Sequence, residues 1–359
     1  MNKILNALLL LALAQVYCLA GIAAEDDFKV GYLCVGPISD WGWNYAHNKG
    51  RLYLESKMPN VKTTLAERIP ESAEAERVLE KMIAQGNKLI YTTSYGFLDP
   101  ALRVAQRHPD VTFMQVNRFD TAKNLGTYFS HQYQPLYIAG TVAGRMTKAN
   151  KLGFIAAHPV PPLLQAVNAF TMGARSVNPK VTTKVIWINS WSDPALEAEA
   201  IKGLVESGVD VVGHIQDNQN TILSTAESLG IYSVGCYSDA HEKAPKGWLT
   251  GASLDWGPFY VDTTKSVINH TWKTGIRAAG MEGGYIKLST IGNVVPADIR
   301  KQALALEENI KAGKFVVFQG PLKDRDGKIR LAAGQKPDVH WLANMDFFVS
   351  GVDGALPHK

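Results

Sequence analysis

Cysteine is scarce in this sequence of 359 residues, which contains only three. Cys18 lies in an N-terminal stretch that we expect to be removed. Cys34 and Cys236 lie in apolar surroundings far apart in the sequence, so we expect both to be buried and free. A scaffold held together by many disulfides is therefore excluded.

An excess of charge of one sign is also lacking, because 37 basic residues stand against 33 acidic ones. One of the basic residues, Lys3, belongs to the N-terminal stretch, so the mature chain carries a net charge of about +3. This near-neutral balance gives no reason to expect a nucleic acid or a membrane surface as the partner.

The familiar motifs of catalysis and cofactor binding are absent as well. The sequence has no Gly-rich Rossmann or P-loop fingerprint, no His-Glu-x-x-His and no Gly-x-Ser-x-Gly. His131, His158, His214 and His241 stand alone, without the spacing of metal ligands. We therefore expect no cofactor and no metal, and binding rather than turnover. Because catalytic triads are spatial, an enzyme stays open as an alternative.

Residues 1–24 are typical of a secretory signal peptide. Lys3 precedes an apolar run over 5–20, and small residues follow before the acidic residues that begin at Glu25. Tyr17 occupies the position where a lipoprotein signal has a small residue before the cysteine, so we expect a soluble periplasmic protein, with a lipid anchor at Cys18 as the alternative. No later segment is apolar for long enough to cross a bilayer.

Apolar runs alternate with helix-period stretches through most of the remaining chain. This alternation predicts an α/β protein with parallel sheets covered by helices on both faces. The expected strands are 29–35, 61–66, 88–93, 111–116, 124–130, 151–156, 181–188, 209–214, 231–236, 249–254, 286–291 and 315–318. The expected helices are 43–57, 72–85, 98–107, 134–147, 161–176, 193–207, 218–229, 257–274 and 297–311.

The same sequence pattern at a helix end occurs twice, about 120 residues apart. A helix, a glycine and a strand follow one another at Gly86 and again at Gly208. We therefore expect two similarly wound lobes joined by a hinge. The first lobe covers 25–130 and is completed by part of 251–285. The second covers 131–250 and is completed by part of 286–359.

The end of the chain has a different character. Residues 319–328 are polar and rich in turn formers, which predicts a surface hairpin. Residues 341–351 are apolar and aromatic again, so we expect them to pack onto a lobe.

The stretch from Gly36 to Asn44 follows the first predicted strand and opens the first predicted helix. Ligands of open α/β sheets bind at the carboxyl ends of the strands, which is where this stretch lies. Trp41 and Trp43 offer flat apolar rings, while Ser39, Asp40 and Asn44 offer groups for a polar edge. A plain helix start, with Ser39 or Asp40 as the N-cap and the indoles in the core, is the alternative interpretation.

The other loops at strand ends carry a similar mixture of aromatic and amide side chains. This mixture suits a sugar as well as a flat heterocycle, so the residues alone leave the ligand class open. The loops are 93–97 and 117–119 in the first lobe, and 157–159, 189–193, 214–218 and 237–239 in the second.

Four local patterns resemble the basic membrane protein family, whose members are substrate-binding proteins of ABC importers and include purine nucleoside receptors. The first is Asp40 ahead of Gly42-Trp43-Asn44, where the family has an acidic residue and then Ser-Phe-Asn. The second is Tyr95 ahead of an Asp-Pro helix start. The third is the turn from Asn189 to Pro194, and the fourth is the turn from Gly235 to Asp239.

The resemblance covers the chain from Lys29 to about Val267 and implies a type I periplasmic binding fold. It places Trp43 and Trp191 where aromatic rings of the two lobes stack on a purine. It also implies that Asp40 and Asn44 bond to the edge of the ring. Tyr95, Tyr237 and Asp239 follow from the other matching turns, and we add three neighbours from the expected loops. These are Trp41, Gln216 and Asp217.

Several family features are missing from this chain. Tyr237 replaces the first acidic residue of the last turn, and 249–256 lacks the family's lysine. The loop 214–218 replaces a glycine-rich one. Since the polar groups of these regions handle the ribose in nucleoside-binding members, their loss favours a free purine base such as adenine over a nucleoside.

The sequence therefore predicts a monomeric periplasmic receptor that captures a purine base between two closing lobes and passes it to an ABC permease. The alternatives are a nucleoside receptor of the same family, an exported nucleoside hydrolase using Asp40 or Asp239 as general base, and a receptor of the same fold for a sugar or a small amide.

Overall fold

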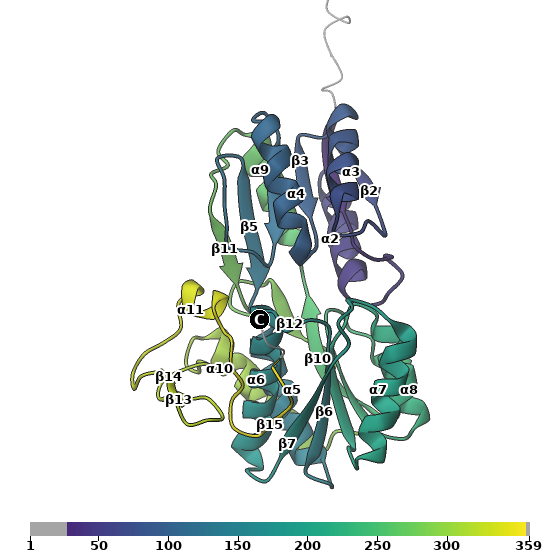
Figure 1. Cartoon of the computed structure of the whole chain (residues 1–359), viewed down its shortest axis with the longest axis vertical. Helices are drawn as coiled ribbons and strands as arrows, with labels where there is room; N and C mark the ends of the chain where they lie inside the picture. Colours follow the sequence, from purple (N-terminus) through teal and green to yellow (C-terminus); the bar gives the residue numbers. More distant parts are fainter. Residues whose placement is uncertain (1–26, 357–359) are drawn as a thin grey trace, which may run out of the picture.

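The computed structural model describes residues 27–356, which form two lobes stacked along the long axis of the molecule (Figure 1). The predicted signal peptide, 1–24, and Cys18 lie outside the described residues. Within 27–356, none of the helices combines the length and the apolar character that a membrane crossing needs.

The first lobe is built on a six-stranded parallel sheet. Its order is β11-β5-β4-β3-β1-β2. The strands are β1 (Phe28–Leu33), β2 (Val61–Ala66), β3 (Leu89–Thr92), β4 (Thr112–Val116), β5 (Leu125–Ser130) and β11 (Ile276–Ala279). The helices are α2 (Trp43–Lys57), α3 (Ala73–Ala84), the short η1 (Tyr95–Phe97), α4 (Leu98–Arg107) and α9 (Gly257–Ile268).

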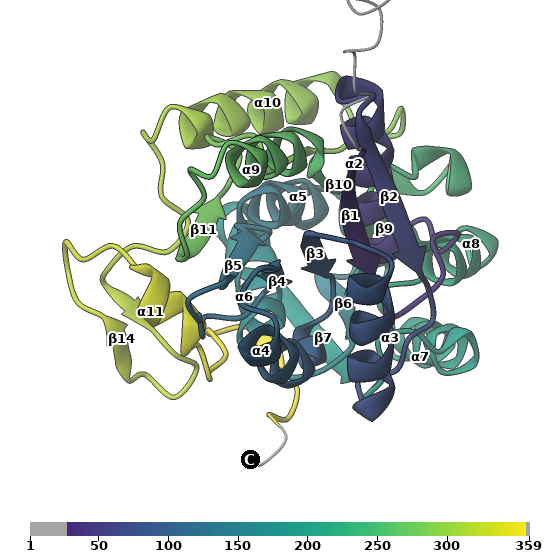
Figure 2. The ribbon, with the colours of Figure 1, turned by 90° about the horizontal axis from the view of Figure 1, so that it is seen from above.

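Helices cover both faces of this sheet, as its uninterrupted apolar strands require. Helices α2 and α9 lie on one face, and α3 and α4 lie on the other (Figure 2). The alternation along β1 shows why, because Tyr32 packs in the core beneath α2 and α9 whereas Leu33 packs with Leu79 and Leu98.

The second lobe has a seven-stranded sheet of the order β12-β10-β9-β8-β6-β7-β15, in which only β12 is antiparallel to its neighbour. The strands are β6 (Lys151–Ala156), β7 (Thr182–Trp187), β8 (Val211–Ile215), β9 (Tyr232–Gly235), β10 (Trp248–Leu254), β12 (Ile286–Leu288) and β15 (Val352–Asp353). The helices are α5 (Tyr133–Met146), α6 (Pro161–Val177), α7 (Pro194–Glu206), α8 (Gln219–Ser228), the short η2 (His241–Lys243) and α10 (Ala297–Lys311).

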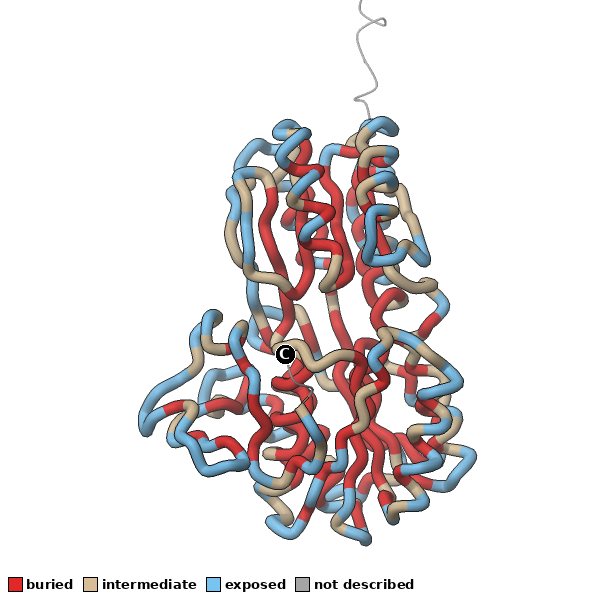
Figure 3. The backbone as a smooth tube through the Cα atoms, in the orientation of Figure 1, coloured by how far each residue is buried: buried red, intermediate tan, exposed pale blue. Residues whose placement is uncertain are grey.

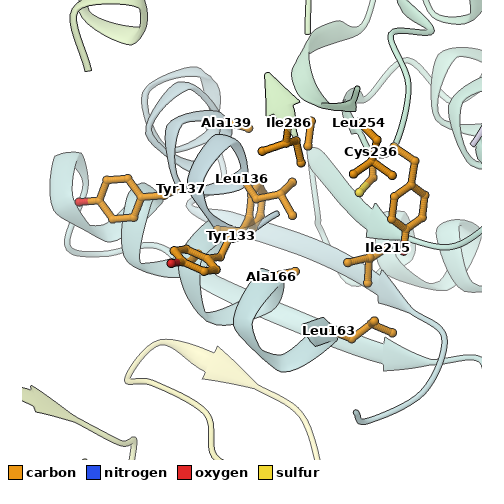
Figure 4. Packing of buried hydrophobic residues seen from close by; sticks show 14 of the residues in the cluster. Tyr133, Leu136, Tyr137, Ala139, Leu163, Ala166, Ile215, Cys236, Leu254 and Ile286 are labelled. Atoms are coloured by element: carbon orange, nitrogen blue, oxygen red, sulfur yellow. The ribbon is translucent and has the colours of Figure 1, made fainter. Parts of the chain in front are cut away.

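Helices α5 and α6 form the apolar interior of the second lobe together with the sheet. Leu136, Leu163 and Ile215 converge there (Figure 4). Glycines let the two helix backbones touch, because a Cβ added to Gly140 would overlap the carbonyl of Phe170. The red stretches of Figure 3 show that each lobe has its own buried centre.

The chain crosses between the lobes three times. It passes from β5 to α5, from β10 to α9, and from β11 to β12. The carboxyl ends of the parallel strands in both sheets therefore face the junction, and the loops that follow these strands meet there.

The C-terminal segment packs on the second lobe. The predicted polar hairpin is confirmed as β13 (Leu322–Lys323) and β14 (Ile329–Leu331). After α11 (Val339–Ala343), the predicted return of the chain to a lobe is confirmed by Asn168 of α6, whose side chain bonds to Phe347 and Val349.

Two sequence predictions need correction, and one strand was missed. Residues 315–318 form no strand, because Phe318 is buried by ring contacts with Tyr133 and Trp341 rather than by a ladder. The helix expected over 257–274 ends at Ile268, before His270 adopts a positive φ of 55°. Strand β11 was not predicted, because its half-exposed edge residues lack a strand's apolar pattern.

The prediction for Cys34 and Cys236 is confirmed. Cys34 and Cys236 are both free and buried, each directly after a strand of a different lobe. Burial raises the pKa of the Cys34 thiol to about 12, so this group is an inert packing residue.

Candidate functional site

A cavity lies between the lobes, where the loops after the parallel strands meet. About 330 Å³ of space there is free of protein atoms, a volume that includes open solvent at the mouth. The first lobe contributes Trp43, Ser94, Tyr95 and Asn117, and the second contributes Val160, Pro162, Leu163, Trp191, Asp217 and Tyr237.

Trp43 forms the wall of the first lobe and is held firmly in place. It is the first residue of α2, and its indole N–H donates to the carbonyl oxygen of Thr93 over 2.6 Å. Its ring also meets His47 and Tyr237 edge-on, at centroid distances of 4.7 and 4.9 Å. With 5% of its surface exposed, this ring has little freedom to move away from the cavity.

Trp191 forms the wall of the second lobe and is held partly by the first. Its indole N–H donates to Glu71 Oε2 over 3.0 Å, and its ring meets His158 edge-on at 4.7 Å. Glu71 Oε1 accepts hydrogen bonds from Ser94 Oγ and the backbone N–H of Gly96, both over 2.6 Å. The first lobe thus fixes the carboxylate that orients the indole of the second.

Asp217 is the one carboxyl group in the cavity lining, and it is 4% exposed. Burial raises the pKa of this group well above its usual range, and the nearby charges of Asp40 and Glu71 raise the pKa further. A hydrogen bond with the side chain of Asn44 acts in the opposite direction. Burial therefore disfavours the charged form of this carboxyl group, and a hydrogen-bond donor placed against it would stabilise that form.

Two lining residues adopt the left-handed backbone region that most side chains avoid. Asn117 has φ 55°, which asparagine tolerates, but Tyr237 has φ 71° in spite of its bulk. Such strained positions persist only where the surroundings impose them, and they gather at ligand sites. The strain at Tyr237 places an aromatic ring against both Trp43 and the cavity.

Five predicted residues line the cavity together: Trp43, Tyr95, Trp191, Asp217 and Tyr237. The structure places the other five elsewhere.

The carboxylate of Asp40 bonds inside the first lobe, and so does Asn44 apart from its hydrogen bond with Asp217. Asp40 Oδ1 accepts from the backbone N–H groups of Gly42 and Tyr45, and Oδ2 accepts from the backbone and side-chain N–H groups of Asn44, all over 2.8–2.9 Å. The expectation that Asp40 reads the edge of a ligand needs correction, because its carboxylate caps α2 instead. Asn44 is fully buried, with its amide bonded to Asp40 and to Gly36.

Trp41, Gln216 and Asp239 also lie outside the lining. Asp239 Oδ2 accepts from the backbone N–H and the hydroxyl of Thr290, over 2.8 and 2.6 Å. Gln216 is buried next to the loop that carries Trp191. With the nitrogen of its side-chain amide facing that loop, the amide donates to the Trp191 carbonyl oxygen over 2.7 Å. Trp41 lies against the surface of the second lobe.

Four positions that line the cavity or contact its walls were not predicted. Val160, Pro162 and Leu163 lie at the start of α6 and carry no polar group that would mark a site. Their only signal is that two prolines begin this helix directly after a predicted cleft loop. Glu71 lies in the β2–α3 loop, outside every loop expected to face the cleft.

The two lobes touch each other directly around the cavity. The backbone N–H of Trp43 donates to the Asp217 carbonyl oxygen over 3.4 Å, and that of Gln219 donates to the Asp40 carbonyl oxygen over 3.2 Å. Together with the bond between Glu71 and Trp191, these contacts define a closed arrangement. Within the described residues, no group of three or more His, Cys, Asp and Glu side chains is placed to hold a metal ion.

A family model described as ABC transporter substrate-binding protein PnrA-like matches residues 28–319. The chain is 40% identical over 351 residues to a purine-binding protein of Brucella abortus, an alignment that covers 97% of this chain and 100% of the relative. It is 30% identical over 338 residues to a putative ABC transporter glucose-binding protein of Haloferax volcanii, with coverage of 94% and 83%.

Solved structures share the fold at lower identity. A solute-binding protein of an ABC transporter system from Aeropyrum pernix superposes with a TM-score of 0.71 at 17% identity, covering 81% of this chain and 94% of that one. Another, from Conexibacter woesei, gives 0.66 at 22% identity, with coverage of 80% and 98%. The type I periplasmic binding fold expected from the sequence is confirmed.

Proposed function

Because the chain belongs to the PnrA-like (Bmp) family of ABC transporter substrate-binding proteins, we propose that it captures a purine base, adenine or a close relative, and delivers it to an ABC permease. The first 24 residues support export to the periplasm, where such a receptor would meet its ligand.

One observation carries this proposal: an indole from each lobe lines the same narrow cavity. Trp43 comes from α2 of the first lobe, and Trp191 from the loop before α7 of the second. A flat heterocycle stacked on Trp43 in an open cleft would gain a second aromatic contact from Trp191 on closure. Stacking of a base on an aromatic side chain contributes about 1–3 kcal/mol per base.

Asp217 would supply the polar part of recognition. A ring N–H or an exocyclic amine of a purine can donate a hydrogen bond to the carboxylate form of this buried group. Leaving such a group without a partner costs about 1–3 kcal/mol or more. Ser94 and Asn117 add a hydroxyl and an amide to the same lining.

A free base suits the cavity better than a nucleoside. The lining is mostly aromatic and aliphatic, with few groups that could satisfy the several hydroxyls of a ribose. A nucleoside receptor is the neighbouring alternative within the same family.

A sugar is the alternative from another ligand class, and it is suggested by the printed name of the Haloferax relative. Aromatic plates also bind sugars, but a sugar needs many donors and acceptors around its rim. Asp217 is the only acidic side chain in this lining, which otherwise offers few polar groups, and this supports the heterocycle.

Binding is favoured over hydrolysis. Asp40 and Asp239, which a nucleoside hydrolase of this chain would use as general bases, are hydrogen-bonded within their own lobes and lie outside the cavity lining.

Calorimetric titration of the mature protein, after unfolding and refolding to remove any bound ligand, tests the proposal. Adenine, hypoxanthine and guanine would be compared with adenosine, inosine and glucose. We expect the tightest binding for a free base. Binding of glucose with no heat from any purine would overturn the proposal, and release of free base from inosine would reveal an enzyme.

A further inference from the structure

Trp41 belongs to the first lobe but packs on the second. Its indole covers a small apolar cluster formed by Leu223 of α8, Ala240, Ala244 and Trp248. The ammonium group of Lys243 lies 4.2 Å from the centroid of the indole, on the same lobe as the cluster. The ring therefore bridges the lobes through apolar contact and through a cation–π contact.

The backbone of Trp41 is bound by the second lobe as well. Its carbonyl oxygen accepts hydrogen bonds from the side-chain amide of Gln219, over 2.7 Å, and from the hydroxyl of Ser238. Trp41 has φ 58°, a left-handed conformation that is costly for so bulky a residue. These contacts from the second lobe help to offset that cost.

Gln219 is prepared for this contact by its own lobe. The side chain is fully buried, and its Oε1 accepts from the backbone N–H of Cys236 over 2.8 Å. The amide nitrogen also donates to the carbonyl oxygen and the hydroxyl of Ser238, over 3.1 and 3.2 Å, in its own lobe. The shortest of the three bonds from this amide nitrogen, at 2.7 Å, is the one that reaches Trp41 of the other lobe.

The neighbouring residue shows how closely the lobes fit here. A Cβ added to Gly42 would overlap the backbone oxygen of Asp217. Only a residue without a side chain lets the loop from Asp40 to Trp43 rest against the start of α8.

We infer that Trp41 is a positioning residue that anchors the closed form, by docking on the cluster of Leu223, Ala240, Ala244 and Trp248 and on Gln219 of the second lobe. The inference rests on the proposed function, because it assigns Trp41 to retention of the captured ligand. Trp41 lies outside the cavity, two residues before Trp43, the first residue of α2, so one short segment carries both the anchor and the indole on which a ligand would stack.

This arrangement has a kinetic consequence. A ligand enters the open form, in which the anchor is undocked, so the anchor has little effect on the association rate. Release requires the lobes to part, which exposes the Trp41 ring and breaks the hydrogen bonds from Gln219 and Ser238 to the Trp41 carbonyl oxygen. The anchor therefore slows dissociation.

Stopped-flow fluorescence with adenine tests the anchor. We expect Trp41→Ala to raise the dissociation rate at least about tenfold while the association rate changes less than about threefold. The dissociation rate of Trp41→Phe should lie between those of wild type and Trp41→Ala. The matched control is Leu52→Ala, an exposed site on α2 of the same lobe, which should leave both rates unchanged. A dissociation rate unchanged in Trp41→Ala would overturn the inference.

A second measurement needs no ligand and separates this inference from the proposed function. Spin labels at Arg77→Cys on α3 and Glu199→Cys on α7 report the distance between the lobes. We expect Trp41→Ala and Gly42→Ala to shift the distances toward longer values. The control is Gly203→Ala on α7, where a Cβ meets no atom within 4 Å. Unchanged distances in both variants would overturn the anchor, whatever ligand the protein binds.

Discussion

The two cavity indoles differ in how they are held, and this difference decides which one is the better target for mutation. Trp43 is buried and bonded within its own lobe, so its removal would also disturb the core. Trp191 is half-buried at the rim, and its N–H reaches Glu71 of the other lobe. A substitution at Trp191 therefore reports on the ligand with less effect on folding.

We predict that Trp191→Ala weakens adenine binding by about tenfold or more, because one aromatic wall is lost. The matched control is Trp187→Ala on β7, whose ring stacks over Phe348 at 6.3 Å and is not part of the cavity lining. Calorimetry of both variants gives the comparison. Equal affinities in the two variants would remove Trp191 from the site.

The raised pKa of Asp217 predicts that binding depends on pH. A purine N–H stabilises the carboxylate, so the complex favours the deprotonated form. Affinity should therefore fall as pH drops below the raised pKa of the free protein and level off above it. In Asp217→Asn this dependence should vanish. A wild-type affinity that stays constant from pH 8 to pH 5 would contradict this role for Asp217.

At this scale the sequence indicates which loops meet but not where each side chain points. Trp43, Trp191 and Asp217 were predictable because they follow strand ends. Trp41 lies only two residues from Trp43, yet the positive φ at Trp41 turns it toward the other lobe. Backbone conformations of this kind leave no clear trace in a single sequence.

Among the elements, the packed pair α5 and α6 is the most sensitive to added volume. We predict that Gly140→Ala destabilises the protein by roughly 1–3 kcal/mol, because the new methyl group would overlap the carbonyl of Phe170. Gly203→Ala in the open flank of α7 should stabilise it by roughly 0.5–1 kcal/mol. Urea unfolding measures both, and similar effects of the two substitutions would contradict the close helix contact.

Helix α7 carries a carboxyl group whose titration should affect stability. Glu197 is fully buried, and one of its oxygens has no hydrogen-bond partner. Burial raises its pKa from an ordinary value of 4.5 to about 7, against the lowering effect of a hydrogen bond from the backbone of Asp193.

Between pH 4.5 and 7 the folded protein therefore binds more protons at Glu197 than the unfolded chain, and stability falls as pH rises through this window. Relative to wild type, Glu197→Gln should gain about 2–3 kcal/mol at pH 8 compared with pH 4.5. Urea unfolding of both proteins at the two pH values checks this. If the difference in stability between the two proteins does not change with pH, ionisation of Glu197 does not destabilise the folded protein.

Element types were largely predictable because the apolar runs and the proline and glycine punctuation agree over most of the chain. The failures share a cause, since β11 and residues 315–318 depend on contacts with distant segments. Strand β11 pairs with β5, which lies about 150 residues earlier in the chain. Phe318 packs against the rings of Tyr133 and Trp341.

For the whole molecule, the contacts between the lobes hold the cavity closed. The cavity has protein contacts at two sides, through Trp191 with Glu71 and through Trp41 with Gln219. Three chain crossings let the lobes move apart without loss of either sheet. The sequence predicted two lobes and a cleft, but the pairing of residues across the cleft depends on how the lobes meet.

The central claim is that a flat purine base is held between Trp43 and Trp191. A crystal structure of the mature protein with adenine tests it most directly. The account predicts a planar ring between the two indoles, with one of its N–H groups within hydrogen-bond distance of the Asp217 carboxylate. Adenine bound elsewhere, or a cavity in which the indoles contact no ligand ring, would contradict it.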